Sequence, residues 1–216
     1  MSACAHLGGH GIPASAPYFT DFVPGRRGEI LDAALMVFAA KGYEAGTVRE
    51  IASLVGVSEP ALYRHYAGKE ALLLDLVSTA GGRISSEAKA RLEAFSAENL
   101  RQSLTQLIHT RRRDTSDSRN IMRTLMDAAP HNPALKETFR TQFGDPMINN
   151  IREFIPRVDA SFEIVRAPEE LEGKVRAFMS IFIGYFMTSM FFGSSTSDDA
   201  IVDAMLAIMG WNAATA

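Results

Sequence analysis

Cysteine is almost absent from this 216-residue chain, since Cys4 is its only example. One cysteine excludes an internal disulfide framework and is typical of the reducing cytoplasm. The first 25 residues also lack the basic start and continuous apolar run of a signal peptide, and they show no hydrophobic periodicity. We therefore expect residues 1–25 to be a disordered arm of a cytoplasmic protein. Such an arm does not favour a metal site at Cys4, His6 and His10.

Recognised catalytic signatures are missing as well. The chain contains no His-Glu-x-x-His, no Gly-x-Ser-x-Gly and no cysteine set at metal-ligand spacing. The segment Ala-Gly-Lys-Glu at 67–70 lacks the leading glycine of a P-loop. The sequence therefore predicts no catalytic residue, no metal and no cofactor, and the protein is not expected to be an enzyme.

The chain has no excess of basic residues, and it lacks the alternation of apolar and polar residues that is typical of β-strands. Its net charge is −3, so any nucleic-acid role must rest on a motif and not on bulk charge. No stretch alternates apolar and polar residues over the length of a strand, so no sheet is expected. Apolar residues make up 47% of the chain and charged residues 22%, which is typical of a folded globular protein. Because apolar positions recur at helical spacing, the sequence predicts an all-α fold.

Helix-turn-helix signals occupy residues 47–66. Thr47 and Glu50 form a capping-box pattern that starts one helix, and Gly56 suits the left-handed conformation that ends it. Ser58 is a suitable N-cap for a second helix, which enters the DNA major groove in this motif. Leu62 and Tyr66 are expected to pack internally. The residues expected to contact phosphates or bases are Thr47, Arg49, Ser58, Glu59, Pro60, Ala61, Tyr63, Arg64 and His65.

Four segments extend this pattern: Thr-Val-Arg-Glu-Ile-Ala (47–52), Gly-Val-Ser (56–58), Ala-Leu-Tyr-Arg-His-Tyr (61–66) and Lys-Glu-Ala-Leu (69–72). They closely resemble the DNA-binding domain of TetR-family transcriptional regulators, and the resemblance covers residues 26–76. It implies a three-helix DNA-binding domain followed by a helical ligand-binding and dimerisation bundle at 77–216. It also implies phosphate contacts from Tyr63, His65 and Lys69, and base neighbours at Glu59, Pro60 and Ala61.

Beyond the motif, helical spacing predicts a helix from Lys69 to about Phe95 with a bend at Gly81–Gly82. Arg111–Arg113 is interpreted as a solvated helix end and not as a phosphate clamp. Methionines and phenylalanines gather after residue 120, and such side chains suit a pocket for an apolar or aromatic small molecule. Ordinary core packing is the alternative for each of them. The candidate pocket residues are Met122, Met126, Phe139, Phe143, Met147, Phe178, Phe182 and Tyr185.

An uncharged run at 177–197 is long enough to cross a membrane. Small residues interrupt it at four-residue steps, and such a stripe lets another helix approach closely. We therefore expect the last two helices, 168–192 and 198–211, to pair with their copies in a four-helix dimer interface. The candidate interface residues are Ser180, Gly184, Thr188, Phe191, Ala204, Ile208 and Trp211.

Together these patterns predict a homodimeric TetR-type repressor that an apolar or aromatic inducer releases from a palindromic DNA operator. A second hypothesis keeps the DNA-binding head but has no inducer, so that the C-terminal half serves dimerisation or a protein partner. An enclosed apolar cavity above about 300 Å³ would favour the first hypothesis, and a packed core would favour the second. An α-helical enzyme with a borrowed helix-turn-helix is the least favoured interpretation.

Overall fold

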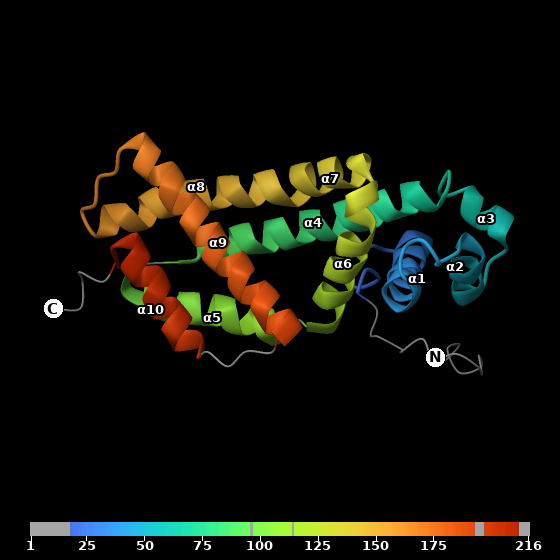
Figure 1. Cartoon of the computed structure of the whole chain (residues 1–216), viewed down its shortest axis with the longest axis horizontal. Helices are drawn as coiled ribbons and strands as arrows, with labels where there is room; N and C mark the ends of the chain where they lie inside the picture. Colours follow the sequence, from blue (N-terminus) through green and yellow to red (C-terminus); the bar gives the residue numbers. More distant parts are fainter. Residues whose placement is uncertain (1–17, 96, 114, 193–196, 212–216) are drawn as a thin grey trace. The chain divides into compact units, whose positions relative to one another are not determined.

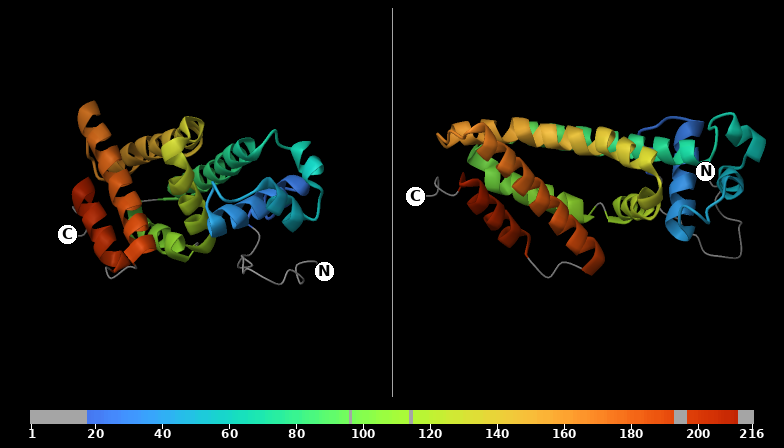
Figure 2. Two further views of the ribbon diagram at one scale, coloured as in Figure 1. Left: turned by 45° about the vertical axis from the view of Figure 1, so that its right-hand side comes forward. Right: turned by 45° about the horizontal axis from the view of Figure 1, so that its top comes forward.

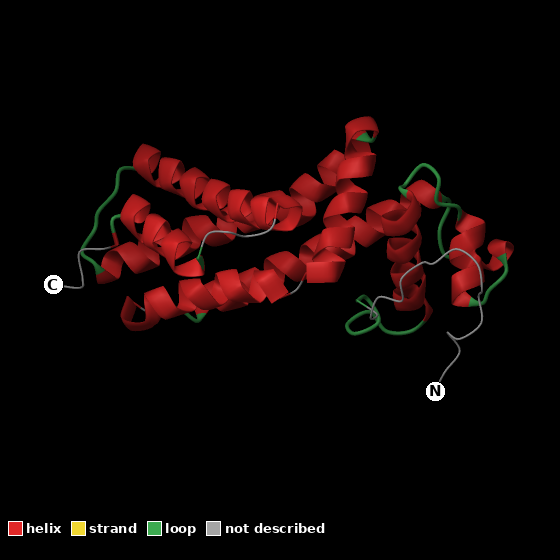
Figure 3. Ribbon diagram, turned by 60° about the horizontal axis from the view of Figure 1, so that its bottom comes forward, coloured by secondary structure: helices red, strands yellow, loops and turns green. Residues whose placement is uncertain are grey.

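The computed structural model describes residues 18–95, 97–113, 115–192 and 197–211 (Figure 1). Within these ranges no strand occurs, which confirms the all-α prediction (Figure 3). Three short segments separate some of the helices: 3-10 turns at Ala97–Asn99 and Ala129–His131, and a π-turn, η3, at Arg140–Gly144. The α-helices are α1 (Arg26–Lys41), α2 (Val48–Val55), α3 (Glu59–Tyr63), α4 (Lys69–Glu93), α5 (Leu100–Arg113), α6 (Thr115–Ala128), α7 (Pro133–Phe139), α8 (Asp145–Ser161), α9 (Pro168–Phe192) and α10 (Asp198–Met209).

These helices form two compact units, and the chain crosses between them at 77/78, 115/116 and 136/137. The first unit contains α1–α3, the start of α4, and α6. The second contains the rest of α4 with α5 and α8–α10. The sequence analysis assigned all residues after 76 to one domain, whereas α6 belongs to the first unit. Long-range side-chain contacts from α6 account for this difference, and they leave no pattern in the local sequence.

The first unit is built around α1, which buries Ile30, Leu31, Val37 and Phe38 almost completely. Helices α2, α3 and α4 each turn apolar residues toward the same unit, and Leu62 of α3 has no exposed surface. Helix α6 buries the face of Ile121, Thr124, Leu125 and Ala128. This core positions the short helices α2 and α3 and leaves their other faces open to solvent.

Residues 18–25 correct the expectation of a disordered arm through residue 25. Phe19 is fully buried and Val23 is 6% exposed. The Asp32 carboxylate accepts hydrogen bonds from the backbone N–H groups of Tyr18, Phe19 and Thr20, at 2.8, 2.6 and 3.0 Å. The segment is ordered because an apolar anchor and a side-chain cap both fix it to α1. Residues 1–17, with Cys4, His6 and His10, lie outside the described residues.

The second unit has its own apolar core, to which α4, α5, α8, α9 and α10 all contribute. Helix α9 packs between α8 and α10, and α10 also contacts α5 (Figure 2). Phe154 of α8 makes edge-to-face contacts with Phe95, Phe178 and Trp211, with ring centroids 5.3–6.0 Å apart. Amphipathic helices stacked in this way bury their apolar stripes against one another.

Two expectations about helix continuity are tested by α4 and α9. Helix α4 continues without a break through Gly81 and Gly82, so the glycines do not interrupt it. In the described ranges no helix, α9 included, is long and apolar enough to cross a membrane. Residues 177–192 of the uncharged stretch are instead part of α9 in the second unit.

Candidate nucleic-acid interface

The start of α2 carries the capping box that the sequence predicts. Thr47 Oγ1 accepts a hydrogen bond from the Glu50 N–H at 3.2 Å, and Glu50 Oε2 accepts one from the Thr47 N–H at 3.1 Å. Lys41 pairs with the other Glu50 oxygen, and this hydrogen bond holds the pKa of Glu50 below its usual range. Two N–H groups of the first turn are thereby satisfied, which fixes where the helix begins.

The turn between α2 and α3 follows from two residues. Gly56 adopts the left-handed conformation, with φ 75° and ψ 33°, in which a residue with a Cβ would be strained. The Val57 N–H then donates to the Ala52 carbonyl at 3.0 Å. Ser58 caps α3, and its Oγ accepts from the Ala61 N–H at 3.3 Å. The chain therefore reverses within a few residues, as in a helix-turn-helix.

One face of α3 and the start of α2 remain accessible. Leu62 and Tyr66 are buried, at 0% and 8% exposure, so their predicted internal packing is confirmed. Tyr63 has 48% of its surface exposed. The other predicted DNA contacts that are exposed are Thr47, Arg49, Ser58, Pro60, Arg64 and His65. Those that are partly exposed are Glu59, Ala61 and Lys69.

Lys69 has a structural role that the sequence did not indicate. Its ammonium donates to the carbonyls of Tyr43 and Glu44, at 2.8 and 3.0 Å, and lies 4.5 Å from the centre of the Tyr43 ring. From the other side, Asp127 of α6 accepts a hydrogen bond from the Tyr43 N–H at 2.6 Å. The loop that leads into α2 is therefore held by both α4 and α6. One N–H of the Lys69 ammonium remains for a phosphate, because an ammonium has three donors.

A buried phenol supports the end of the recognition segment. The Tyr66 hydroxyl donates to Asp75 at 2.6 Å, and Arg27 binds the same carboxylate through two nitrogens, at 2.6 and 3.0 Å. Burial, and then the hydrogen bond to Asp75, raises the pKa of Tyr66. This contact links α1, α4 and the segment after α3. It could not be found from sequence, because Arg27 and Asp75 lie 48 residues apart.

The predicted pocket residues are divided between the two units. Met122 and Met126 lie on α6 of the first unit, and Met126 is 45% exposed. The other members belong to the second unit, where Met147 and Phe178 are almost fully buried in its core. Two open clefts of about 480 and 420 Å³ in this unit are lined by other residues. The remaining members are partly buried: Phe139 and Phe143, which stack with centroids 4.9 Å apart, Phe182, and Tyr185, whose hydroxyl donates to Asp198.

Among the predicted interface residues whose side chains the structure describes, all except Trp211 are exposed. Trp211 is a correction: it is 3% exposed, packs on Phe154 and donates its Nε1–H to Asp159 at 2.7 Å, so it belongs to the core of its own subunit. The spacing of apolar residues does not distinguish a side chain in the core of its own subunit from one in a dimer interface. The side chain of Phe191 lies outside the described residues. The exposed members are Ser180, Gly184 and Thr188 on α9, and Ala204 and Ile208 on α10.

Replacing Thr47 with alanine is expected to weaken α2 by about 1 kcal/mol, because its first turn loses an N-cap acceptor. Hydrogen exchange of the amides of residues 48–55 should then become about five-fold faster. Thr47→Ser is the matched control, since it keeps the hydroxyl. Equal protection in the two variants would show that the cap does not hold this helix.

A capped helix, a left-handed glycine turn and a short second helix with an open face define a helix-turn-helix DNA-binding domain. Residues 30–76 match the family described as "Bacterial regulatory proteins, tetR family". This part of the chain is therefore a TetR-family DNA-binding domain, as the sequence predicts.

Curated relatives match only part of the chain. The HTH-type transcriptional repressor AcnR of Corynebacterium diphtheriae is 40% identical over 74 residues, which are 34% of this chain and 35% of AcnR. Matches to curated relatives span 22% to 64% of the length of those proteins.

Two solved structures share the fold over most of the chain. Bacillus subtilis FadR in complex with stearoyl-CoA has a TM-score of 0.66 at 17% identity, covering 84% of this chain and 96% of its own. The SmeT–triclosan complex has a TM-score of 0.67 at 18% identity, covering 84% and 90%. At these identities the likeness establishes the fold and nothing further.

Proposed function

We propose that this protein is a homodimeric DNA-binding transcriptional regulator that reads a palindromic operator through α2 and α3. The observation that carries the proposal is the open face of this motif. Tyr63, Arg64 and His65 point away from a core in which Leu62 is fully buried. Polar and basic side chains at the start of α2, such as Arg49, can meet phosphates while α3 lies in the major groove.

Selection from random duplex DNA tests the proposal directly. The full chain should enrich an inverted repeat whose half-sites lie about one helical turn, roughly 34–36 Å, apart or a multiple of it, because a two-fold dimer presents two reading heads. Enrichment of a single unrepeated site would contradict the dimeric mode of reading. No enrichment over the starting pool would contradict DNA recognition itself.

Arg49→Ala should weaken binding about equally on all selected sequences. It removes a phosphate contact, so the slope of log affinity against log salt should decrease in magnitude by about 1. Arg123→Ala on α6 is the matched control, since it removes an exposed arginine of the same unit outside the motif. A fluorescence anisotropy titration at several salt concentrations measures both quantities. Identical salt slopes for the two variants would remove Arg49 from the interface.

Dimerisation is supported by the exposed small-residue stripe of α9. Ser180, Gly184 and Thr188 are exposed, and so are Ile183 on α9 and Ile208 on α10, at 41% and 43%. The Thr188 hydroxyl donates to the Gly184 carbonyl at 2.8 Å, so it needs no partner from outside. Small side chains and satisfied polar groups allow a second pair of helices to approach closely.

We further propose that an apolar or aromatic small molecule releases the operator, so that the protein acts as a repressor. Phe143 and Tyr185 are partly buried against the core of the second unit, and Phe139 stacks on Phe143. The neighbours FadR and SmeT were solved with stearoyl-CoA and triclosan, and AcnR is a repressor. Titrating each of these two compounds should weaken operator binding, and the operator should weaken compound binding by the same factor, because linkage is reciprocal.

The alternative, a regulator without an inducer, is favoured by the packing of the second unit. Met147 and Phe178 are already 5% and 2% exposed in its core. A ligand would have to displace such side chains or bind beside them. Insensitivity of operator binding to both compounds, and to a wider panel of apolar molecules, would favour this alternative.

A further inference from the structure

The apolar side chains of the α7–α8 segment recur at an unusual spacing. Four residues of an α-helix turn by about 400°, so a stripe at four-residue steps drifts by about 40° per step and by about 160° over four steps. A straight α-helix could not keep such a stripe on one face. The positions that follow this spacing are Phe139, Phe143, Met147, Ile151 and Ile155.

The π-turn η3 (Arg140–Gly144) compensates for this drift. A π-turn holds one extra residue and therefore removes about 100° of the rotation. After the turn, Met147, Ile151 and Ile155 of α8 are buried, at 5%, 2% and 0% exposure. Phe143, within the turn, packs against the same core, and Phe139 before it stacks on Phe143. The four-residue spacing of the apolar residues is therefore consistent with the extra residue in the π-turn.

The inner side of the π-turn rests directly on α4. A Cβ at Gly81 would lie 3.3 Å from the Phe143 Cβ and 3.4 Å from the carbonyl of Gln142. The Ser85 hydroxyl lies 3.4 Å from the same carbonyl oxygen, and Asn150 donates to the Ser85 carbonyl at 3.0 Å. An alanine at this position would require Phe143 to shift by a few tenths of an ångström. At the neighbouring Gly82 an added Cβ would meet nothing within 4 Å.

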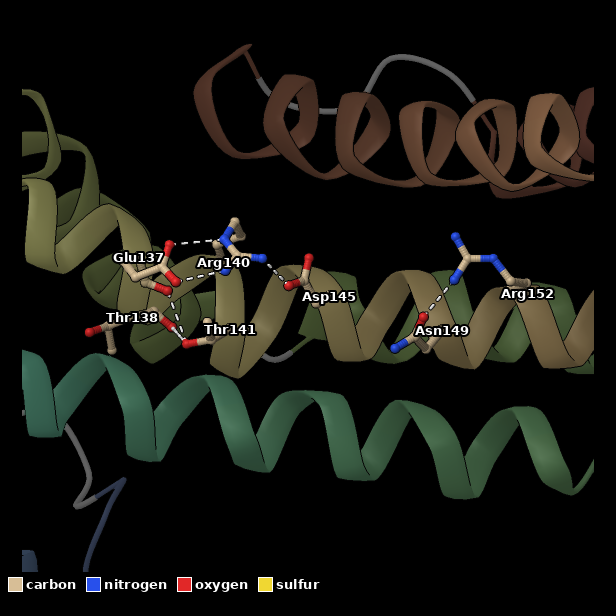
Figure 4. A network of polar contacts seen from close by, with 7 residues as sticks. All are labelled: Glu137, Thr138, Arg140, Thr141, Asp145, Asn149 and Arg152. Atoms are coloured by element: carbon tan, nitrogen blue, oxygen red, sulfur yellow. Dashed lines mark hydrogen bonds and ion pairs between the residues drawn. The ribbon is translucent and has the colours of Figure 1, made fainter.

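The outer side of the π-turn is bridged by exposed ion pairs. Arg140 binds Glu137 through two nitrogens, at 2.6 and 2.9 Å, and also pairs with Asp145 (Figure 4). The Thr141 hydroxyl donates to the Glu137 carbonyl at 3.0 Å. Exposed pairs of this kind are weak and exchange readily with water. The π-turn therefore packs closely against α4 on its inner side, whereas the ion pairs on its outer side can break at a small cost in free energy.

The contact lies where the chain passes between the two units. Gly81 is the fourth residue after the crossing at 77/78, and Arg140 is the fourth after the crossing at 136/137. Before the second of these crossings, Asn132 accepts from the Leu135 N–H at 2.9 Å and donates to Glu70 at 3.0 Å. Glu70 follows Lys69, which holds the loop into α2. A change of register in the π-turn can therefore reach the reading head, α2 and α3, along α7 and through the hydrogen bond between Asn132 and Glu70.

We propose that the contact between Gly81 and the π-turn is the conformational joint that sets the DNA affinity of the reading head. Closing the π-turn into an α-helical turn moves α7 by one residue, about 1.5 Å along its axis and about 100° around it, which pulls Asn132 away from Glu70. The inference rests on the proposed DNA-binding function. It assigns the regulation of DNA affinity to the contact between Gly81 of α4 and the backbone of the π-turn.

Adjacent glycines supply a matched test. In the full chain, Gly82→Ala should bind the selected operator duplex within two-fold of the wild type, whereas Gly81→Ala should bind it at least ten-fold more weakly. Hydrogen exchange at residues 137–145 should slow when the duplex is added to the wild type and to Gly82→Ala, and should stay fast in Gly81→Ala. A merely structural glycine would not change that response. Equal operator affinities and equal exchange rates in the two variants would contradict the proposal that this contact controls DNA binding.

Deletion of Gln142 provides a second variant if Gly81→Ala does not fold. Removing this exposed residue converts the π-turn into an α-helical turn without truncating a buried side chain. The deletion variant should keep its helical circular dichroism and lose at least ten-fold in operator affinity, and wild-type affinity would overturn the proposal. Failure of the wild type to enrich any duplex would instead contradict the DNA-binding function itself, so the two failures are distinguishable.

Discussion

Replacing Asp159 with alanine is expected to lower the free energy of unfolding of the second unit by about 3–5 kcal/mol. Asp159 is 3% exposed. It accepts two hydrogen bonds from Arg166, at 2.7 and 2.9 Å, and one from the Trp211 indole at 2.7 Å. Without this carboxylate the Arg166 guanidinium stays buried beside only one other carboxylate, that of Glu170. Removing the main partner of a buried charge is among the most destabilising results of a single substitution.

The pKa of Arg166 points in the same direction. The hydrogen bonds that Arg166 donates to Asp159 raise the pKa of the guanidinium above its ordinary value, so the pair stabilises the charged form. Neutralising the partner by mutation removes that stabilisation, and deprotonation of Arg166 cannot relieve the strain at neutral pH. The cost therefore has to appear as lost stability.

Trp211 makes the measurement direct, because it is the one tryptophan of the chain. Urea unfolding followed by its fluorescence reports the unit that contains Asp159. Asp203→Ala is the matched control: it removes an aspartate paired with Arg101, but both side chains are more than half exposed, at 61% and 52%. That change should cost less than about 1 kcal/mol. Similar losses in the two variants would show that burial does not decide the strength of the pair.

The helix-turn-helix is the part of the molecule that local sequence describes best. Its boundaries depend on Thr47, Glu50, Gly56 and Ser58, which act within a few residues of themselves. Caps and turns are chemical properties of short segments, so they can be predicted without knowledge of the fold. The capping box, the glycine turn and the burial of Leu62 all follow from such signals.

Contacts between distant residues could not be predicted in the same way. Asp127 holds the Tyr43 N–H across 84 residues, and nothing near either position indicates the other. Trp211 shows the same limit, since helical spacing identifies an apolar face but not the surface that covers it. The four-residue spacing of the α7–α8 stripe was available in the sequence, but only the register of η3 gives it a structural meaning.

Gly184→Arg is expected to separate the dimer and to reduce operator affinity on the order of 100-fold, because each half-site is then bound without the gain from its tethered neighbour. Gly184 is exposed, and an added Cβ there meets nothing within 4 Å in the subunit, so a side chain can leave the helix at this position. In the proposed interface the same position would face the α9 of a second copy. A charged side chain between two closely packed helices has no room and no partner there.

Gly173→Arg on the same helix is the matched control. Gly173 is also exposed, and an added Cβ there also meets nothing within 4 Å. Both substitutions remove a helical glycine, so their effects on the helix itself should be alike. Sedimentation velocity should find Gly173→Arg dimeric, with the wild-type affinity for the inverted repeat, and Gly184→Arg monomeric, with weak binding to one half-site. A Gly184→Arg protein that remains dimeric would place the interface elsewhere, because its stripe of small residues would no longer permit close approach.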